Sequence, residues 1–208
     1  MDTGSDYRIT TPEALRQRMG HAGEVTPVKL LRELDDPAID FIRRSPFLVL
    51  STADAAGHQE ASPKGDDPGF VIVEDRKTLL IPDRKGNKLL FGLQNILANP
   101  QVGLLFIVPP NTETLRVNGT AELTIDPALL ERLAARGKPA EIVIRLTVQQ
   151  CFFHCAKAFI RSRLWEHQAW PARTPLSFGK YLAAKLDKDA EVAREIDEAV
   201  EQDYRTNL

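Results

Sequence analysis

The chain has 208 residues, of which 43% are hydrophobic and 27% charged, and its formal net charge is −2. These values are typical of a globular protein with one core, or with one core and helical appendages. They exclude the strongly basic surface that binds nucleic acid or an anionic membrane, and the longest apolar run (102–108) is too short to span a bilayer.

The N-terminal residues and the two cysteines indicate the cellular compartment. Residues 1–6 are polar and acidic, unlike a secretory signal peptide. Cys151 and Cys155 lie four positions apart, and nothing around them suggests an oxidising compartment. We therefore expect a cytoplasmic protein with reduced thiols.

Residues 1–45 predict a helical collar outside the main core. Thr11 is suited to cap a first helix, because a proline follows it, and Gly20 is suited to end that helix. A second helical pattern runs over 28–34, and Pro37 begins a third. We find no residues here that are suited to catalysis or binding.

Residues 46–170 predict a different structure, in which short β-rich runs alternate with turn signals. The expected strands are 47–52, 58–64, 70–73, 77–81, 102–108, 114–125 and 141–153. Helices are expected over 89–97 and from Pro127 to about Arg136. Strands at hairpin spacing with one inserted helix favour a small antiparallel barrel over a doubly wound sheet, which needs more crossover helices. Residues 171–208 form a C-terminal helical extension, with a charged helix from Asp189 to Tyr204.

The stretch 79–90 joins the end of an apolar strand to a cationic loop. Pro82 is expected to stop the strand ladder, because proline lacks the N–H donor. The cationic and amide side chains that follow are Arg84, Lys85, Asn87 and Lys88. A helix is expected to begin at Leu89, so these donors and the free N–H groups of its first turn would together bind an anion. The alternative is a solvated basic turn.

The strand from residue 114 has an unusually polar face. Strand alternation puts Thr114, Arg116 and Asn118 on one face and the apolar Leu115 and Val117 on the other. Simple exposure to solvent is the alternative explanation.

A second polar cluster lies at residues 152–165. Lys157, Arg161, Ser162 and Trp165 recur at spacings of three to four, so on a helix they would form one stripe. Trp165 could equally be a core anchor whose N–H finds a carbonyl. His154 and the cysteines beside it supply at most three ligands and no second cluster follows, so we expect no metal site.

Several motifs, in order along the chain, are similar to the FMN-binding split barrel of the pyridoxamine 5′-phosphate oxidase-like family. They lie at 47–52, 61–66 (Ala-Ser-Pro-Lys-Gly-Asp), 83–88 (Asp-Arg-Lys-Gly-Asn-Lys), 99–106, 117–123 and 152–155. The resemblance covers about residues 41–170. It implies a mainly β fold with flanking helices, an antiparallel split β-barrel, and a homodimer with two FMN sites at the subunit interface.

The resemblance also implies cofactor contacts, which fall into three groups. Residues that would face or border the flavin ring are Ser62, Lys64, Ile81 and Asp83. Residues that would hold the 5′-phosphate are Arg84, Asn87 and Lys88. Residues that would reach the flavin bound mainly by the other subunit, or that are similar to the family's C-terminal contacts, are Thr114, Arg116, Lys157, Arg161, Ser162 and Trp165.

Two departures from the family limit what the resemblance implies. The segment between the basic loop and Asn99 is about one helical turn longer than in the oxidases, and their substrate-binding Arg-x-His pair has no clear counterpart. Oxidation of pyridoxamine phosphate is therefore not implied. The functions that fit are an FMN-dependent oxidoreductase of unknown substrate, with NADH or NADPH as a candidate co-substrate, a flavin- or haem-binding module without turnover, and a deazaflavin (F420)-dependent reductase. The sequence identifies no catalytic acid or base.

Overall fold

A computed structural model of the protein describes residues 7–207. Residues 1–6, on which the expectation about a signal peptide rests, and residue 208 lie outside the described residues. Within 7–207, no helix combines the length and the apolar character that crossing a bilayer requires.

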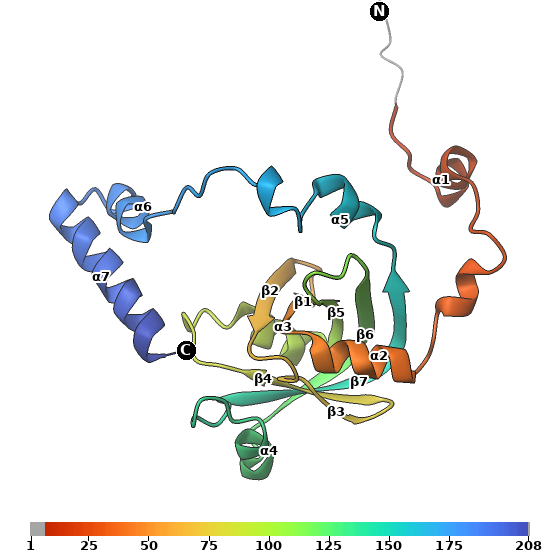
Figure 1. The fold of residues 1–208 in the computed structure, drawn as a ribbon, viewed down its shortest axis with the longest axis horizontal. Helices are drawn as coiled ribbons and strands as arrows, with labels where there is room; N and C mark the ends of the chain where they lie inside the picture. The colour runs from red at the N-terminus through yellow and green to blue at the C-terminus, as the bar shows by residue number, and fades with distance from the viewer. Residues whose placement is uncertain (1–6, 208) are drawn as a thin grey trace, which may run out of the picture.

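Seven antiparallel strands form one curved sheet, which is the centre of the molecule (Figure 1). The strands are β1 (Phe47–Ala53), β2 (Gln59–Gly65), β3 (Ile72–Asp75), β4 (Thr78–Asp83), β5 (Gln101–Ile107), β6 (Thr114–Thr124) and β7 (Ile142–His154). Their order across the sheet is β2-β1-β5-β6-β7-β4-β3. The predicted mainly β fold with flanking helices, an antiparallel split barrel, is confirmed.

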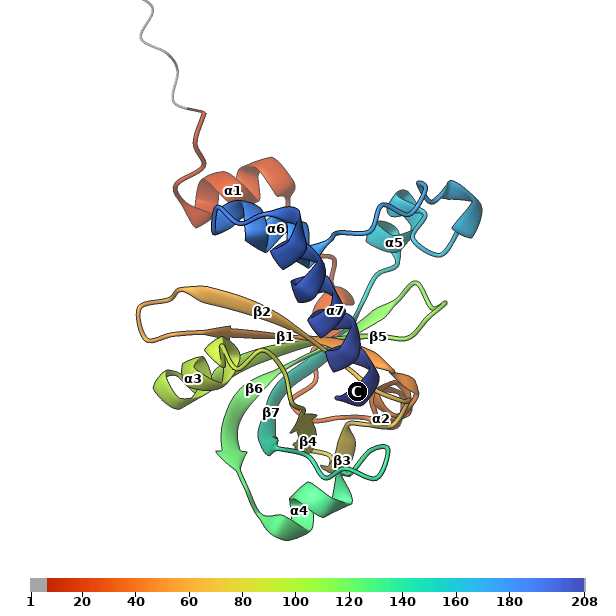
Figure 2. The same ribbon diagram turned by 90° about the vertical axis from the view of Figure 1, so that its left-hand side faces the viewer.

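Helices flank this sheet and continue beyond it at both ends of the chain. The α-helices are α1 (Pro12–Met19), α2 (Asp36–Arg44), α3 (Phe91–Ala98), α4 (Pro127–Arg132), α5 (Lys157–Ser162), α6 (Phe178–Lys185) and α7 (Ala190–Thr206). Short 3₁₀ turns are η1 (Thr26–Lys29) and η2 (His167–Ala169). Helices α2 and α3 pack on the sheet, whereas the segment from α5 to α7 arches away from it (Figures 1 and 2).

Among the described residues, the larger of two hydrophobic clusters fills the barrel, and a smaller one around Leu80 and Val143 lies beside it. The fully buried side chains of the larger cluster include Leu48 and Leu50 of β1, Phe106 of β5 and Leu115 of β6. Helix α2 closes the core because Phe41 and its neighbours on the same face are buried. Helix α1, by contrast, buries no residue. Helix α2 is therefore part of the packed barrel, whereas α1 is not.

The helix caps behave as predicted, but one expected helix is absent. The Thr11 side chain accepts a hydrogen bond from the N–H of Ala14, and Gly20 ends α1 with a φ of 77°. The prediction of a helix over 28–34 is wrong, because Leu31 pairs with Cys151 by two backbone hydrogen bonds of 2.9 Å. Pairing with the edge of β7 thus overrides the local helical periodicity.

Strand β4 continues through Pro82 to Asp83, so the prediction that Pro82 stops the ladder is wrong. The carbonyl of Asp83 accepts a hydrogen bond of 3.0 Å from the N–H of Glu141, which directs the Asp83 backbone toward β7. Successive residues of a strand direct their backbone groups to opposite sides. Pro82 therefore faces the β3 side, where pairing has already ended at Leu80, and its missing N–H breaks no hydrogen bond.

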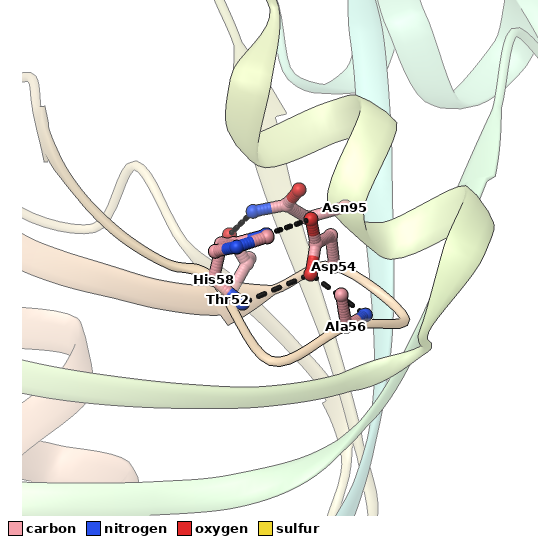
Figure 3. A network of polar contacts seen from close by, with 5 residues as sticks. All are labelled: Thr52, Asp54, Ala56, His58 and Asn95. Carbon is pink, nitrogen blue, oxygen red and sulfur yellow. Dashed lines mark hydrogen bonds and ion pairs between the residues drawn. The ribbon is translucent and has the colours of Figure 1, made fainter.

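The turn between β1 and β2 is held by a polar network (Figure 3). One carboxylate oxygen of Asp54 accepts hydrogen bonds from the N–H groups of Ala56 and His58, at 2.8 and 2.9 Å. The other lies 2.7 Å from Nδ1 of His58. Asn95 donates to the hydroxyl of Thr52 at 3.1 Å and so ties α3 to β1.

The ion pair in this turn shifts the pKa values of both Asp54 and His58. The hydrogen bond to Asp54 raises the pKa of His58 above 6.5, and the same hydrogen bond lowers the pKa of Asp54. The contribution of His58 to stability is lost as pH rises through its raised pKa, and that of Asp54 is lost as pH falls through its lowered pKa. The turn is therefore most stable between these two values.

We expect an NMR titration of His58 to give a midpoint above 6.5 in the wild type and a lower one in Asp54→Asn. Glu60→Gln, which removes an acid from the same hairpin, is the control and should leave the midpoint unchanged. An Asp54→Asn variant with the wild-type midpoint would contradict the role of this carboxylate.

Candidate functional site

A cleft of about 940 Å³ opens where β2 and β4 approach each other at the split of the barrel. In the described sheet these two strands are not hydrogen-bonded neighbours. The cleft is lined by β2 from Glu60, by the end of β4 with the loop that follows it, by the first turn of α3, and by Glu141 and Ile142 at the start of β7.

Two ion pairs connect the walls of the cleft. Lys64 of β2 contacts the carboxylate of Asp83 at the end of β4. Arg84, the next residue, donates to Oδ2 of Asp66 through Nε at 3.1 Å and Nη2 at 3.0 Å. These side chains hold the two strands together where the backbone ladder does not. Two predicted ligand-binding cations, Lys64 and Arg84, therefore already have carboxylate partners within the chain.

One nitrogen of Arg84 is left without a partner. Among the buried side-chain nitrogen and oxygen atoms of residues 7–207, only Nη1 of Arg84 lacks a hydrogen bond. A buried polar group without a partner costs about 1–3 kcal/mol, more when it is charged, so such groups are rare in folded proteins. Arg84 lines the cleft, but Nη1 itself is nearly inaccessible to solvent, so a ligand oxygen would reach it only if the loop shifts on binding.

The loop after Arg84 is more irregular than predicted. The expected helix start at Leu89 is wrong by two residues, because α3 begins at Phe91. Lys88 and Leu90 adopt left-handed backbone conformations, with φ of 60° and 58°, which non-glycine residues rarely adopt outside constrained sites. The N–H of Leu89 donates to the side-chain oxygen of Asn87 at 3.0 Å. The first turn of α3 still lines the cleft, as the anion-site prediction requires.

Six of the predicted site residues line this cleft. They are Ser62, Lys64, Asp83, Arg84, Asn87 and Lys88. Ile81 is fully buried in the core, and it is the neighbouring Pro82 that reaches the cleft.

The other predicted residues lie elsewhere and do not line the cleft. Thr114, which is buried, pairs with His154 at the end of β7, whereas Asp83 pairs with Ile142 at its start. These two ends are separated by about 40 Å of strand at 3.3 Å per residue. The remaining members of this set, on β6 and in the C-terminal segment, are Arg116, Lys157, Arg161, Ser162 and Trp165. A single chain does not bring the two groups together.

The predicted stripe of residues 157–165 is only partly correct. Helix α5 ends at Ser162 because Arg163 turns left-handed, with a φ of 53°. Trp165 is therefore off the helix, and its indole N–H donates to the carbonyl of Asn111 at 2.8 Å. This is the anchoring role given above as the alternative. Lys157 and Arg161 remain exposed on α5.

The two cysteines lie in different environments. Cys151 is buried and donates to the carbonyl of Glu33 at 3.1 Å, and burial raises the pKa of its thiol to about 11. Such a thiol is a poor nucleophile at neutral pH. Cys155 is exposed, with its sulfur 3.9 Å from Nδ1 of His154. The described part of the chain contains no group of three or more His, Cys, Asp or Glu side chains suited to a metal ion.

Three of the four acidic residues of the cleft, Glu60, Asp66 and Glu141, were missed by the sequence reasoning, which had identified only Asp83. The basic side chains that line it are Lys64, Arg84, Lys85 and Lys88, and the acidic ones are Glu60, Asp66, Asp83 and Glu141. The cleft is therefore balanced in charge rather than uniformly basic. The signal in the sequence was the Asp66-Asp67 pair directly after β2, because acids at the end of a strand can meet a basic loop.

A family model described as pyridoxamine 5′-phosphate oxidase matches residues 34–155. The chain belongs to this family. Every residue that lines the cleft lies within the match, from Leu50 to Ile142. Lys157, Arg161 and the helices α6 and α7 lie outside it.

Several solved structures are similar to this member of the pyridoxamine 5′-phosphate oxidase family at low sequence identity. HupZ from Group A Streptococcus is 20% identical, with a TM-score of 0.48, over 58% of this chain and 93% of that chain. An F420 reductase is 19% identical, with a TM-score of 0.43, over 57% and 98% of the two chains. An FMN-binding protein from Syntrophomonas wolfei is 11% identical, with a TM-score of 0.45, over 69% and 96%. No curated protein matches the chain.

Proposed function

We propose that this protein is an FMN-dependent oxidoreductase whose cleft holds the flavin. The observation that supports this most directly is that Arg84, Asn87 and Lys88, three side chains suited to an anion, line one cleft of about 940 Å³. A phosphate oxygen is the natural partner for a guanidinium nitrogen. The volume lies within the usual range of about 300–1,000 Å³ for ligand sites.

The residues of the cleft fit the parts of FMN. Arg84, Asn87 and Lys88 would hold the 5′-phosphate, together with the N–H groups at the start of α3. Ser62 and Lys64 on β2 would border the ring, and Lys64 is held in place by its ion pair with Asp83. The bound flavin would supply the redox chemistry, whereas the protein orients it and limits its exposure to water.

A second copy of the chain would complete the site. The predicted contacts of β6 and α5 do not line the cleft of their own chain, although Arg116, Lys157 and Arg161 are exposed and available to another molecule. A two-fold axis would bring one chain's exposed set to its partner's cleft and create two equivalent sites. We therefore propose a homodimer in which each FMN contacts both chains.

The test is a visible spectrum of the purified protein while FMN is titrated in, followed by NADH or NADPH under anaerobic conditions. We expect the flavin bands to shift on binding and to bleach on reduction. Binding without reduction by either nicotinamide would favour a flavin module without turnover. If the protein binds a deazaflavin but not FMN, the proposed cofactor is a deazaflavin instead of FMN. If it binds neither, the proposal is contradicted.

A further inference from the structure

Asp66 is an acid buried in a site expected to bind an anion. Its side chain is only 4% exposed. Its backbone is fixed by a hydrogen bond of 3.1 Å from its N–H to the carbonyl of Pro46. A buried carboxylate is costly unless it is fully paired, so its partners indicate why it is there.

Both oxygens of Asp66 are occupied by arginines. Oδ2 accepts from Nε and Nη2 of Arg84, and Oδ1 lies 3.0 Å from Nη1 of Arg136. Oδ1 also accepts from the N–H of Asp67 at 2.9 Å. Hydrogen bonds and ion pairs to both oxygens thus restrict rotation of the carboxylate.

The contact between Asp66 and Arg84 determines which guanidinium nitrogen is left without a hydrogen-bond partner. The carboxylate oxygen occupies the Nε–Nη2 side, so that Nη1 is the nitrogen left buried and unpartnered. An arginine held along one side in this way loses little further side-chain entropy when its other end meets a phosphate. An unrestrained arginine in the same loop would have to be ordered on binding.

We propose that Asp66 is a positioning residue, which fixes the guanidinium of Arg84 in the wall of the cleft so that it receives the phosphate of the ligand, with Arg136 as its second anchor. This inference rests on the proposed function, because the ligand is taken to be FMN. It adds to that function the claim that an acidic residue, Asp66, strengthens the binding of the anionic phosphate. The opposite possibility is that Asp66 competes with the phosphate for Arg84, in which case its removal would tighten binding.

The experiment compares the dissociation constants of FMN and riboflavin, which differ only in the phosphate. Asp66→Asn keeps the shape of the side chain but weakens its hydrogen bonds to Arg84. We expect it to raise the dissociation constant of FMN about tenfold and that of riboflavin less than about twofold. In the Arg84→Ala background, Asp66→Asn should have no further effect on the ratio of the two constants, because the two residues act as one unit.

Asp67→Asn is the matched control, since it removes the same charge from the adjacent, exposed position and should leave the ratio unchanged. Arg136→Ala is a second test that leaves both Arg84 and Asp66 in place, and it should lower the FMN preference by less than Asp66→Asn. Thermal melts without ligand identify any variant that fails to fold.

Tighter FMN binding in Asp66→Asn would overturn the inference and make Asp66 a competitor. An equal loss in the wild-type and Arg84→Ala backgrounds would also overturn it. In both cases a wild type that prefers FMN to riboflavin would leave the proposed function intact. A wild type that binds both ligands equally would overturn the phosphate site itself.

Discussion

Replacing Arg84 by alanine should weaken FMN binding by about 10- to 100-fold while riboflavin binding changes little. The loss of a charge-assisted hydrogen bond costs about 1.5–3 kcal/mol, and about 1.4 kcal/mol corresponds to a tenfold change in Kd. Riboflavin has no phosphate, so it loses no such contact. Isothermal titration with both ligands measures the difference.

The control for this variant is Arg132→Ala. Arg132 is paired with Glu74 at 3.6 Å and does not line the cleft, so its removal should affect neither ligand. Equal weakening of FMN and riboflavin by Arg84→Ala would mean that Arg84 acts through its ion pair with Asp66, by closing the split of the barrel, and not on the phosphate.

A charge reversal at Arg116 should impair dimer formation and FMN binding together. Arg116 is exposed on β6, and its guanidinium lies 5.8 Å from the centre of the Phe152 ring. Placing a carboxylate there would put an acid beside the anionic ligand and into the proposed interface. Because FMN would bind the assembled dimer, sedimentation of the wild type should show dimers that resist dilution better with FMN than without it.

Lys29→Glu is the matched control for Arg116→Glu. Lys29 lies over the same Phe152 ring, also at 5.8 Å, so the control shares the loss of a cation–π contact, worth about 0.5–1 kcal/mol at an exposed site. We expect it to leave assembly and FMN affinity unchanged. An Arg116→Glu protein that stays dimeric but loses FMN would make Arg116 a cofactor contact only. A wild-type monomer that binds FMN at full strength would contradict the dimer.

The strands were predictable because they rest on local patterns. Alternating apolar residues such as Leu115 and Val117 need only one buried face, and the turn after Ala53 has its own sequence signal. The helix cap at Thr11 was equally local. The predictions that failed depend on partners far away in the chain. Leu31 left a helical pattern because the edge of β7 offered it two hydrogen bonds.

The site was predictable in its residue types but not in its electrostatics. The basic loop and β2 do meet in one cleft, as the family resemblance implied. The carboxylates that pair with Arg84 and Lys64 come from the opposite wall in each case, and no local pattern indicates which acid faces which base. Arg136, which contacts Asp66, comes from a loop after α4 that carried no functional signal. Such pairings depend on how the barrel closes.

The most direct test of the shared site uses a dimer that combines two defective chains. Arg84→Ala damages the cleft, and Arg161→Ala damages the proposed contribution from the partner. In a mixed dimer, isolated by different tags on the two chains, one site would receive both defects and the other neither. We predict about one tight FMN per mixed dimer, whereas either variant alone binds weakly at both sites. Weak binding at both sites of the mixed dimer would contradict a flavin site built from two chains.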